Sequence, residues 1–295
     1  MNSLVVDLKL LIKRIVTNSD ILSAIRRNYS MLETDLYFKK IQRNYYNTSF
    51  SDKIKKYKNT HVGERCFVLG NGPSLKAEDL EWIKDEYSFA ANRVYLIFDK
   101  TDWRPSFWIC QDRQLIRSLT DFYQSYDGDI FLGYQALHDF GINVPKANYY
   151  LCNARQVIRR KTQLDFSAEA DKYIIDGASV TYSAIQMAVY MGFSEIYLLG
   201  MDHQFSHTLD KNRRIVAHKD VKIDYFDNRY KDAFKKFEEK GKTYAAPDSE
   251  MITYAFEAAK RYCDDHGVEI FNATRGGKLE VFTRVDFDDI VEVRK

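Results

Sequence analysis

The chain has 295 residues and a formal net charge of +2; hydrophobic residues make up 45% of it and aromatic residues 15%. This length is enough to bury a core in one large or two small domains. The aromatic content, with only four prolines, excludes a disordered or low-complexity chain. Because the charges nearly balance, we expect no nucleic-acid partner and only a local anion site.

The cysteines and apolar runs restrict the class of protein further. Cys66, Cys110, Cys152 and Cys263 include no Cys-x-x-Cys spacing, so reduced, buried thiols are expected rather than a zinc site or a redox pair. The first residues do not read as a signal peptide, and no run reaches the roughly 20 apolar residues that cross a bilayer. The sequence therefore predicts a cytoplasmic protein.

Residues 3–30 carry apolar side chains at near-helical spacing with Lys and Arg between them, which predicts one or two amphipathic helices. Such helices pack on their own domain or on another subunit, or lie on an anionic membrane surface. A homo-oligomer and a peripheral contact with the inner membrane are therefore alternative expectations. The polar stretch Lys40–Asn59 predicts a connector. We expect an N-terminal helical region and connector over residues 1–60, and a main domain over residues 61–295.

From Arg65 onward, strand and helix patterns alternate. Short apolar runs predict strands at Arg65–Leu69, Tyr87–Ala91, Phe107–Cys110, Asp129–Leu132, Tyr149–Leu151, Glu195–Leu199 and Glu269–Asn272. Helical patterns occupy Asp79–Lys84, Arg113–Tyr123, Ser179–Met191 and Ser249–Asp265. Such alternation predicts an α/β, Rossmann-like fold with a mostly parallel sheet and helices on both faces. Ligands of these sheets bind beyond the carboxyl ends of the strands, where the strand order reverses.

The first predicted strand ends in a turn of small residues, Gly70-Asn71-Gly72-Pro73-Ser74. The two glycines accept φ > 0, Pro73 favours the start of a helix, and Ser74 is a candidate helix cap. We expect bare amides and a helix N-terminus to face an anionic ligand here. An ordinary strand-to-helix loop is the alternative.

Polar clusters follow other predicted strands as well. The candidate ligand-binding residues at these ends are Asn92, Arg93, Gln111 and Asp112. A second small-residue turn, Gly177-Ala178-Ser179, precedes the long apolar helix, and its Ser179 is a candidate cap or ligand contact. Two loops of this kind on one sheet suit a nucleotide that presents both phosphate and sugar.

Asp202 and His203 follow the strand Glu195–Leu199. Imidazole titrates near neutrality and a nearby carboxylate orients it, so His203 is a candidate general base with Asp202 beside it. His207 and His218 are alternatives. Both belong to the charged, Tyr-rich segment 203–247, which is expected to be an active-site lid or a solvated surface excursion.

The acidic residues do not predict a metal site. Asp286-Phe287-Asp288 has Asp-x-Asp spacing but lies in a helix-like tail rather than at a strand end, so we expect neither metal nor cofactor. Arg275 follows the last predicted strand. It is a candidate cation for a phosphate, or part of a turn that returns the chain to the sheet.

Taken together, these blocks resemble a known family. Their order, Leu69–Leu75, Ala91–Arg93, Trp108–Asp112, Gly177–Ser179 and Tyr197–His203, is similar to that of the MptE-like family, which shares motifs with family 42 sialyltransferases. The resemblance covers about residues 62–290. It implies a Rossmann-like domain that moves an acidic sugar, sialic acid-like or another nonulosonate or ulosonate, from a CMP-activated donor without metal.

The resemblance also implies roles for single residues. Asn71, Gly72, Pro73 and Ser74 would line the nucleotide and phosphate, Asn92 would contact the donor, and Ser179 would meet the cytidine part. Two lid tyrosines hold the leaving phosphate in the sialyltransferases, and Tyr225 and Tyr230 are the candidates here. The histidine that those enzymes place before their last long helix is absent, since this chain has Ala245-Ala246-Pro247-Asp248. The base is therefore expected to be His203 or His218.

We predict a CMP-sugar-dependent glycosyltransferase of surface-polysaccharide or lipopolysaccharide assembly, with a glycan or lipid-linked acceptor. Archaeal relatives imply an alternative, a 6-hydroxymethylpterin diphosphokinase that needs ATP and magnesium. A third reading is a nucleotide-binding assembly subunit without catalysis. The sequence leaves the sugar, the acceptor, the linkage and the oligomeric state open.

Overall fold

The computed structural model describes residues 20–210, 214–221, 223–230 and 246–292. The chain divides into two compact units, Met1–Asn44 and Tyr45–Lys295. Helix α2 (Asp20–Tyr46) begins in the first unit, which confirms the helix predicted for residues 20–30. The rest of that prediction, residues 3–19, lies outside the described residues.

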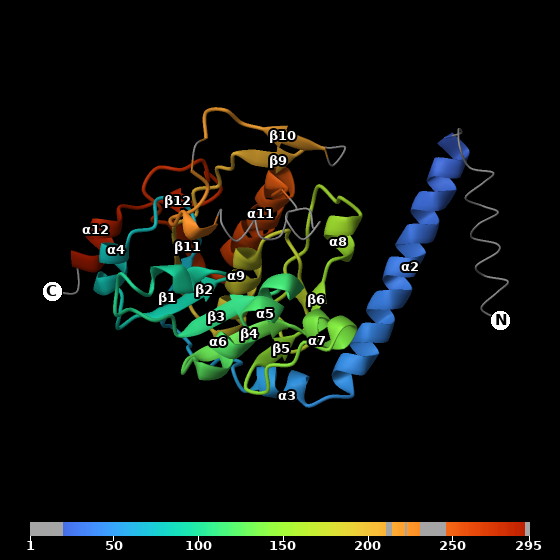
Figure 1. Cartoon of the computed structure of the whole chain (residues 1–295), viewed down its shortest axis with the longest axis horizontal. Helices are drawn as coiled ribbons and strands as arrows, with labels where there is room; N and C mark the ends of the chain where they lie inside the picture. Colours follow the sequence, from blue (N-terminus) through green and yellow to red (C-terminus); the bar gives the residue numbers. More distant parts are fainter. Residues whose placement is uncertain (1–19, 211–213, 222, 231–245, 293–295) are drawn as a thin grey trace. The chain divides into compact units, whose positions relative to one another are not determined.

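The second unit is built on an eight-stranded sheet in which every neighbouring pair of strands is parallel (Figure 1). All seven predicted strands are present, and β12 was missed because it has only two residues. In chain order the strands are β1 (Arg65–Leu69), β2 (Tyr87–Ala91), β3 (Phe107–Cys110), β4 (Asp129–Gly133), β5 (Asn148–Tyr150), β8 (Glu195–Leu199), β11 (Glu269–Asn272) and β12 (Thr283–Arg284).

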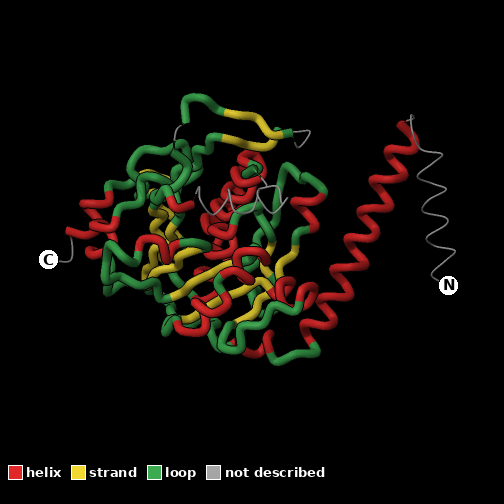
Figure 2. The backbone as a smooth tube through the Cα atoms, in the orientation of Figure 1, coloured by secondary structure: helices red, strands yellow, loops and turns green. Residues whose placement is uncertain are grey.

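Helices and two small strand pairs complete the unit, and the sheet runs through the middle of it (Figure 2). The helices are α3 (Phe50–Lys55), α4 (Ala77–Trp82), α5 (Arg113–Ser118), α6 (Thr120–Ser125), α7 (Tyr134–Phe140), α8 (Arg155–Ile158), α9 (Val180–Met191), α11 (Ser249–His266), α12 (Phe287–Glu292) and the 3-10 helix η1 (Val94–Ile97). The small pairs join β6 (Cys152–Asn153) to β7 (Ile174–Ile175) and β9 (His207–Leu209) to β10 (Ile215–Ala217). The predicted helix Arg113–Tyr123 is two helices, because Leu119 leaves the helical region at φ −114° and ψ 9°.

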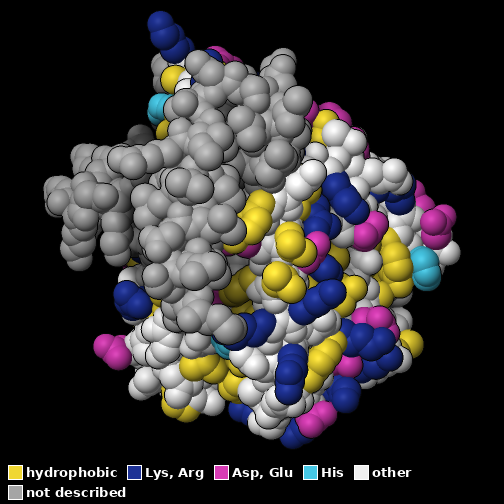
Figure 3. All heavy atoms as spheres, turned by 90° about the vertical axis from the view of Figure 1, so that its right-hand side faces the viewer, with side chains coloured by type: hydrophobic (Ala, Val, Ile, Leu, Met, Phe, Trp, Pro, Cys, Tyr) yellow, Lys and Arg dark blue, Asp and Glu magenta, His cyan; other side chains and the backbone are white. Residues whose placement is uncertain are grey.

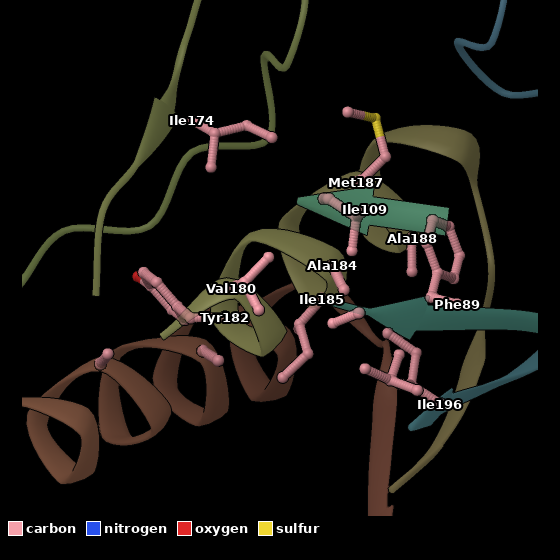
Figure 4. Packing of buried hydrophobic residues seen from close by; sticks show 14 of the residues in the cluster. Phe89, Ile109, Ile174, Val180, Tyr182, Ala184, Ile185, Met187, Ala188 and Ile196 are labelled. Atoms are coloured by element: carbon pink, nitrogen blue, oxygen red, sulfur yellow. The ribbon is translucent and has the colours of Figure 1, made fainter. Parts of the chain in front are cut away.

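Two adjacent residues of β3 show that both faces of the sheet are covered. Successive side chains of a strand point to opposite faces. Trp108 packs edge-on against Tyr123 and Tyr126, with ring centroids 4.9 and 5.1 Å apart. Ile109, the next residue, belongs to the cluster that includes α9 (Figure 4). These contacts agree with the α/β, Rossmann-like fold that the sequence predicts.

Helix α9 forms the centre of this core. Eleven of its 12 residues are buried, which explains why its sequence is apolar on nearly all sides. Ala184, Ile185 and Ala188 lie towards Phe89 of β2 and Ile196 of β8 (Figure 4). The four cysteines are buried and free, as the sequence predicts.

The order of the strands, β12-β11-β8-β1-β2-β3-β4-β5, reverses between β1 and β8. From β1 the chain builds the sheet outward to β5, then crosses back and continues from β8 to β12. The loops after β1 and β8 therefore leave the sheet in opposite directions at one point. In open α/β sheets, this topological switch point is where a ligand crevice forms.

The connector predicted over Lys40–Asn59 is not what the structure has there. Helix α2 continues to Tyr46 and α3 follows at Phe50–Lys55. Tyr45 and Ile54 are fully buried, and the Tyr45 hydroxyl donates to the carbonyl of Tyr149. The Lys- and Asn-rich composition concealed these helices because only a few of their residues face the core.

The described helices include no candidate for a membrane-spanning segment. None of the described helices combines the length and apolar character needed to cross a bilayer. On the coloured part of the face in Figure 3, Lys and Arg side chains are interspersed with Asp, Glu and hydrophobic side chains.

The substitution Ile54→Ala tests the position of α3 in the core. Ile54 is 0% exposed, so we expect a loss of about 2–5 kcal/mol in the free energy of unfolding, measured by chemical denaturation. Ile215→Ala is the matched control, since Ile215 is 58% exposed, and it should cost less than about 1 kcal/mol. Equal effects of the two variants would contradict the packing described.

Candidate functional site

A cavity of about 630 Å³ lies at the switch point, and we refer to it as the switch-point cavity. Its walls come from the loops after β1, β2, β3 and β8, from the start of α9, and from described parts of the segment 203–247. The predicted site residues that line it are Gly70, Asn71, Gly72, Asn92, Arg93, Gln111, Asp112, Ala178, Ser179, Asp202, His203, Tyr225 and Tyr230. The predicted residues outside its described lining are Pro73, Ser74, Gly177, His218 and Arg275.

The glycines of the first turn allow the loops after β1 and β8 to approach each other closely. A Cβ on Gly70 would lie 2.3 Å from the Gly200 carbonyl oxygen, and one on Gly72 would overlap the Asp202 carboxylate. Neither glycine has a positive φ, whereas Gly200 does, at 66°. The positive φ that these two glycines can accept is therefore not used, and the glycines are required because two backbones meet here.

The amides of this turn are not bare either, which corrects the phosphate cradle predicted for it. The Gly70 and Gly72 N–H groups donate to the carbonyls of Leu199 and Gly200, at 2.8 and 3.0 Å. The Ser74 N–H donates to Asp202. Asn71 keeps its N–H without an acceptor among the described residues, and its buried Oδ1 also lacks a partner there.

Ser74 does not cap a helix, and Pro73 does not begin one. Helix α4 starts at Ala77 with Lys76 in the cap position. The Ser74 hydroxyl instead donates to Asp202 Oδ2 at 2.7 Å. Burial raises the pKa of Asp202 above its usual value, while the hydrogen bonds from Ser74 act in the opposite direction.

Asp202 and His203 are neighbours in sequence, but they do not form the predicted acid–imidazole pair. The carboxylate bonds to Ser74, while His203 Nε2 lies 2.9 Å from the hydroxyl of Thr253. That hydroxyl donates to the Ser249 carbonyl, so it accepts from Nε2–H and leaves the lone pair on Nδ1. Burial lowers the pKa of His203, which keeps the ring neutral and able to accept a proton near pH 7.

Arg93 supplies positive charge to the cavity. It is 9% exposed and is the single Lys or Arg among the described lining residues. Its guanidinium donates to the Tyr95 hydroxyl at 3.3 Å, and no carboxylate of the described chain pairs with it. Since a buried guanidinium without a counter-ion is costly, this residue favours an anionic ligand.

The start of α9 also faces the cavity without a cap. Ser179 occupies the cap position as predicted, but its hydroxyl lies 2.6 Å from the Thr181 hydroxyl and bonds to no backbone amide of the helix. The first N–H groups of a helix have no intrahelical acceptor. Ser179, Val180 and Thr181 all line the cavity, so the positive end of α9 is open to a ligand.

Gln111 and Asp176 form a half-buried network next to this helix end. Gln111 Nε2 donates to Asp176 at 3.4 Å, and its Oε1 accepts from the hydroxyls of Ser183 and Tyr150. Asp176 also accepts from the Ala178 N–H at 2.8 Å. Burial raises the pKa of Asp176. Asp176 therefore fixes the turn before α9.

Several other candidates have structural partners. Asp112 caps α5 by accepting from the N–H groups of Gln114 and Leu115. Asn92 has φ 54° and accepts from Trp108 Nε1 through its carbonyl. Gly177 packs so closely against Tyr182 that a Cβ would lie 2.4 Å from the ring. Asp112 and Asn92 line the cavity and only part of each remains available to a ligand, whereas Gly177 lies outside the described lining.

Arg275 and His218 lie away from the cavity, so two predicted roles are corrected. Arg275 forms ion pairs with buried Asp79 and exposed Asp288, and these occupy its guanidinium. This agrees with the alternative reading of a turn that returns the chain to the sheet. His218 Nε2 lies 2.8 Å from the Thr208 hydroxyl in the β9–β10 pair. His207 is exposed on β9.

The described part of the segment 203–247 brings two tyrosines to the cavity. The rings of Tyr225 and Tyr230 stack, with centroids 4.2 Å apart and planes 6° apart. The Phe226 N–H donates to the Asn71 carbonyl at 3.1 Å. Arg229 bonds to Asp99 and to Asp227. The tyrosine pair is therefore anchored to the loops after β1 and β2. Residues 211–213, 222 and 231–245 of the segment, including Ala245, lie outside the described residues.

The described carboxylates of the cavity do not come together as a group of metal ligands. Among the described residues, no three His, Cys, Asp or Glu side chains come together in a way that could hold a metal ion. Asp224 accepts from Ser206, and Asp248 caps α11 and pairs with Arg160. Asp286 and Asp288 lie at α12, as the helix-like tail predicted.

Comparison with known proteins gives one family. A family model described as 6-hydroxymethylpterin diphosphokinase MptE-like matches residues 36–208, which is more than half of the chain. No curated protein matches the chain. The matched range contains the loops after β1, β2, β3 and β8 and the start of α9, but neither Tyr225 nor Tyr230.

The substitution Ser74→Ala tests how Asp202 is held. It removes the hydroxyl donor from a buried carboxylate, so we expect a loss of about 1–3 kcal/mol in unfolding free energy at pH 7. The loss should shrink in acid. The variant raises the pKa of Asp202 further above its unfolded value, and that penalty disappears once Asp202 is protonated in both states.

The matched control is Ser118→Ala. The Ser118 hydroxyl donates to the neutral carbonyl of Leu115, so its effect should not depend on pH. Denaturation at pH 7 and below pH about 4 measures both variants. The same loss from Ser74→Ala at both pH values would rule out the proposed coupling to Asp202.

Proposed function

The chain belongs to the MptE-like family, and from this premise we propose that it is a nucleotide-dependent transferase that moves an acidic sugar from a CMP-activated donor to a surface glycan or lipopolysaccharide acceptor. The family supports a transferase-like activity. The CMP-sugar donor and the glycan acceptor are our proposal, supported by the charges and hydrogen-bonding groups of the switch-point cavity.

The observation that carries the proposal is the buried, unpaired Arg93 in a cavity that also receives the uncapped start of α9. A guanidinium and helix amides together bind phosphate oxygens by charge-assisted hydrogen bonds. Asn71 adds an N–H donor and an Oδ1 acceptor that have no partner among the described residues. Such donors and acceptors suit the phosphate and the polar edge of a nucleotide. This assignment moves the phosphate site from the turn Gly70–Ser74 to Arg93 and α9.

In this reaction His203 acts as the general base. Its neutral Nδ1 takes the proton of an acceptor hydroxyl while the acceptor oxygen attacks the anomeric carbon of the donor sugar. The bond from that carbon to the phosphate oxygen breaks, and its electron pair leaves with CMP. Arg93 and the first amides of α9 stabilise the negative charge on the departing phosphate. Tyr225 and Tyr230, which line the same cavity, are our candidates for contact with this phosphate.

The description of the family favours a second candidate, a 6-hydroxymethylpterin diphosphokinase that transfers diphosphate from ATP. That activity would need magnesium. The described carboxylates of the cavity accept hydrogen bonds from protein donors and do not assemble into a metal-ligand group, so their arrangement does not fit an ion held by the protein alone. Nucleotide binding without turnover would favour the third reading, an assembly subunit.

A nucleotide panel with Arg93→Gln tests the proposal. CMP and CDP should raise the melting temperature of the wild-type protein more than ATP or GTP with magnesium, because a ligand of the folded state stabilises it more the tighter it binds. Arg93→Gln should weaken CMP binding about tenfold or more. Arg117→Gln, a substitution at the exposed end of α5, should leave it unchanged. Stabilisation by ATP or GTP but not by CMP or CDP would refute the CMP-dependent function.

The substitution His203→Asn tests the base. Release of CMP from a panel of CMP-activated acidic sugars should fall at least about a hundredfold, whereas His218→Asn should retain it. For the wild type, kcat/KM should decline only as the pH falls below the usual imidazole range, because burial lowers the pKa of His203 below 6.5. If His203→Asn keeps full activity with the same pH profile, the base is another residue.

A further inference from the structure

A second hollow reaches His203 and has no role in the function proposed so far. It is an open groove of about 580 Å³ between one face of α11 and the loop 278–281, and we call it the α11 groove. His203 lines both this groove and the switch-point cavity. Thr253, whose hydroxyl holds His203 Nε2, also lines it. The groove is therefore a second route to the same imidazole.

One carboxylate of the groove has no partner in the part of the chain that the structure describes. Glu257 lies four residues after Thr253, hence one turn further along the same face of α11. Arg261 lies another turn on, a spacing that normally favours an ion pair with Glu257. No such pair forms, because the Arg261 guanidinium donates to the Leu164 carbonyl. Within the described chain, Glu257 makes neither a hydrogen bond nor an ion pair.

The other acids of the groove have partners. Asp264 pairs with Lys260 at 2.9 Å, and Glu280 pairs with Arg284 at 2.8 Å. Leu279 and Val281 add apolar surface beside these charges. A sugar ring is held by polar groups that bond its hydroxyls and by an apolar surface that contacts its C–H face. The groove has both, since it combines a free carboxylate and a guanidinium with further N–H donors beside a small apolar wall.

The geometry of the proposed reaction is compatible with such a second route. In a direct displacement, the acceptor oxygen approaches the anomeric carbon from the side opposite to the leaving phosphate. The phosphate leaves towards Arg93 and α9 in the switch-point cavity, so an acceptor that shared this cavity would compete with the donor. His203 lines both the switch-point cavity and the α11 groove, so donor and acceptor can reach it from separate sites.

We propose that the α11 groove is the acceptor site, that it binds a saccharide through Glu257 and Arg261, and that it presents an acceptor hydroxyl to His203. The proposal rests on the proposed function for the donor. The step balances: the acceptor oxygen forms the new bond to the anomeric carbon, the bond to phosphate breaks with its electrons leaving on CMP, and the hydroxyl proton passes to His203.

The first experiment measures access to His203. Diethyl pyrocarbonate modifies neutral imidazole, and peptide mass spectrometry reports the rate at His203 in protein saturated with CMP. CMP alone should slow the modification less than about twofold, because the groove stays open. Glu257→Trp, which fills the groove, should slow it about tenfold. Asp265→Trp, on the same helix but outside the described lining, is the matched control and should behave like the wild type.

The second experiment tests the class of ligand. The CMP-saturated protein is applied to a glycan array, where the wild type and Asp265→Trp should bind the same saccharides while Glu257→Gln and Glu257→Trp lose them. An unchanged thermal shift with CMP in each variant shows that the fold and the donor site are intact.

The outcomes separate this inference from the proposed function. The acceptor site would be overturned if CMP protected His203 completely from modification. It would also be overturned if His203 were modified at the same rate in Glu257→Trp and in the wild type, or if the wild type bound no saccharide on the array. Failure of CMP to bind the wild type would instead overturn the donor. Both experiments on the groove can still be carried out on the protein without nucleotide.

Discussion

The contact between the loops after β1 and β8 is the constraint on which the rest of this structure depends. At the switch point, the Gly72 N–H donates to the Gly200 carbonyl and the Asp202 carboxylate accepts from Ser74. Side chains at Gly70 or Gly72 would collide with the opposite loop. These hydrogen bonds hold the two loops together, so they form one rigid side of the cavity, and the other walls are arranged around it.

This locked contact also explains why the glycine turn does not act as an anion cradle. The Gly70 and Gly72 amides donate to the carbonyls of Leu199 and Gly200, since buried backbone groups need partners. An anion would instead bind to groups that have no counter-ion or cap within the described chain. Arg93 has no counter-ion in the described chain, and Ser179 does not cap α9. In a buried site such unpaired groups are costly unless a ligand completes them.

His203 connects the two hollows of the second unit. It has a left-handed backbone, with φ 48°, at the end of the β8 loop, a conformation that is strained for a residue with a side chain and persists where its surroundings hold it. The bond to Thr253 and the edge-on contacts with Phe205 and Phe256 provide that support. Burial lowers the pKa of the imidazole and keeps it neutral. Because His203 lines both the switch-point cavity and the α11 groove, donor and acceptor can meet at this residue.

The sequence by itself determined the sheet and the edge at which the site lies. Strand and helix boundaries follow from local apolar periodicity, so β1, β2, β3, β8 and β11 were predicted with their observed limits. The carboxyl ends of parallel strands share an edge, so most of the predicted site residues line one cavity. What only the tertiary structure decided is how each polar group is used. Whether an amide, Asp202 or Arg275 is free or already paired depends on partners far away in the chain, and no local pattern encodes those distances. The same holds for Ile54, because its helix α3 packs against β5, a strand that lies far away in the sequence.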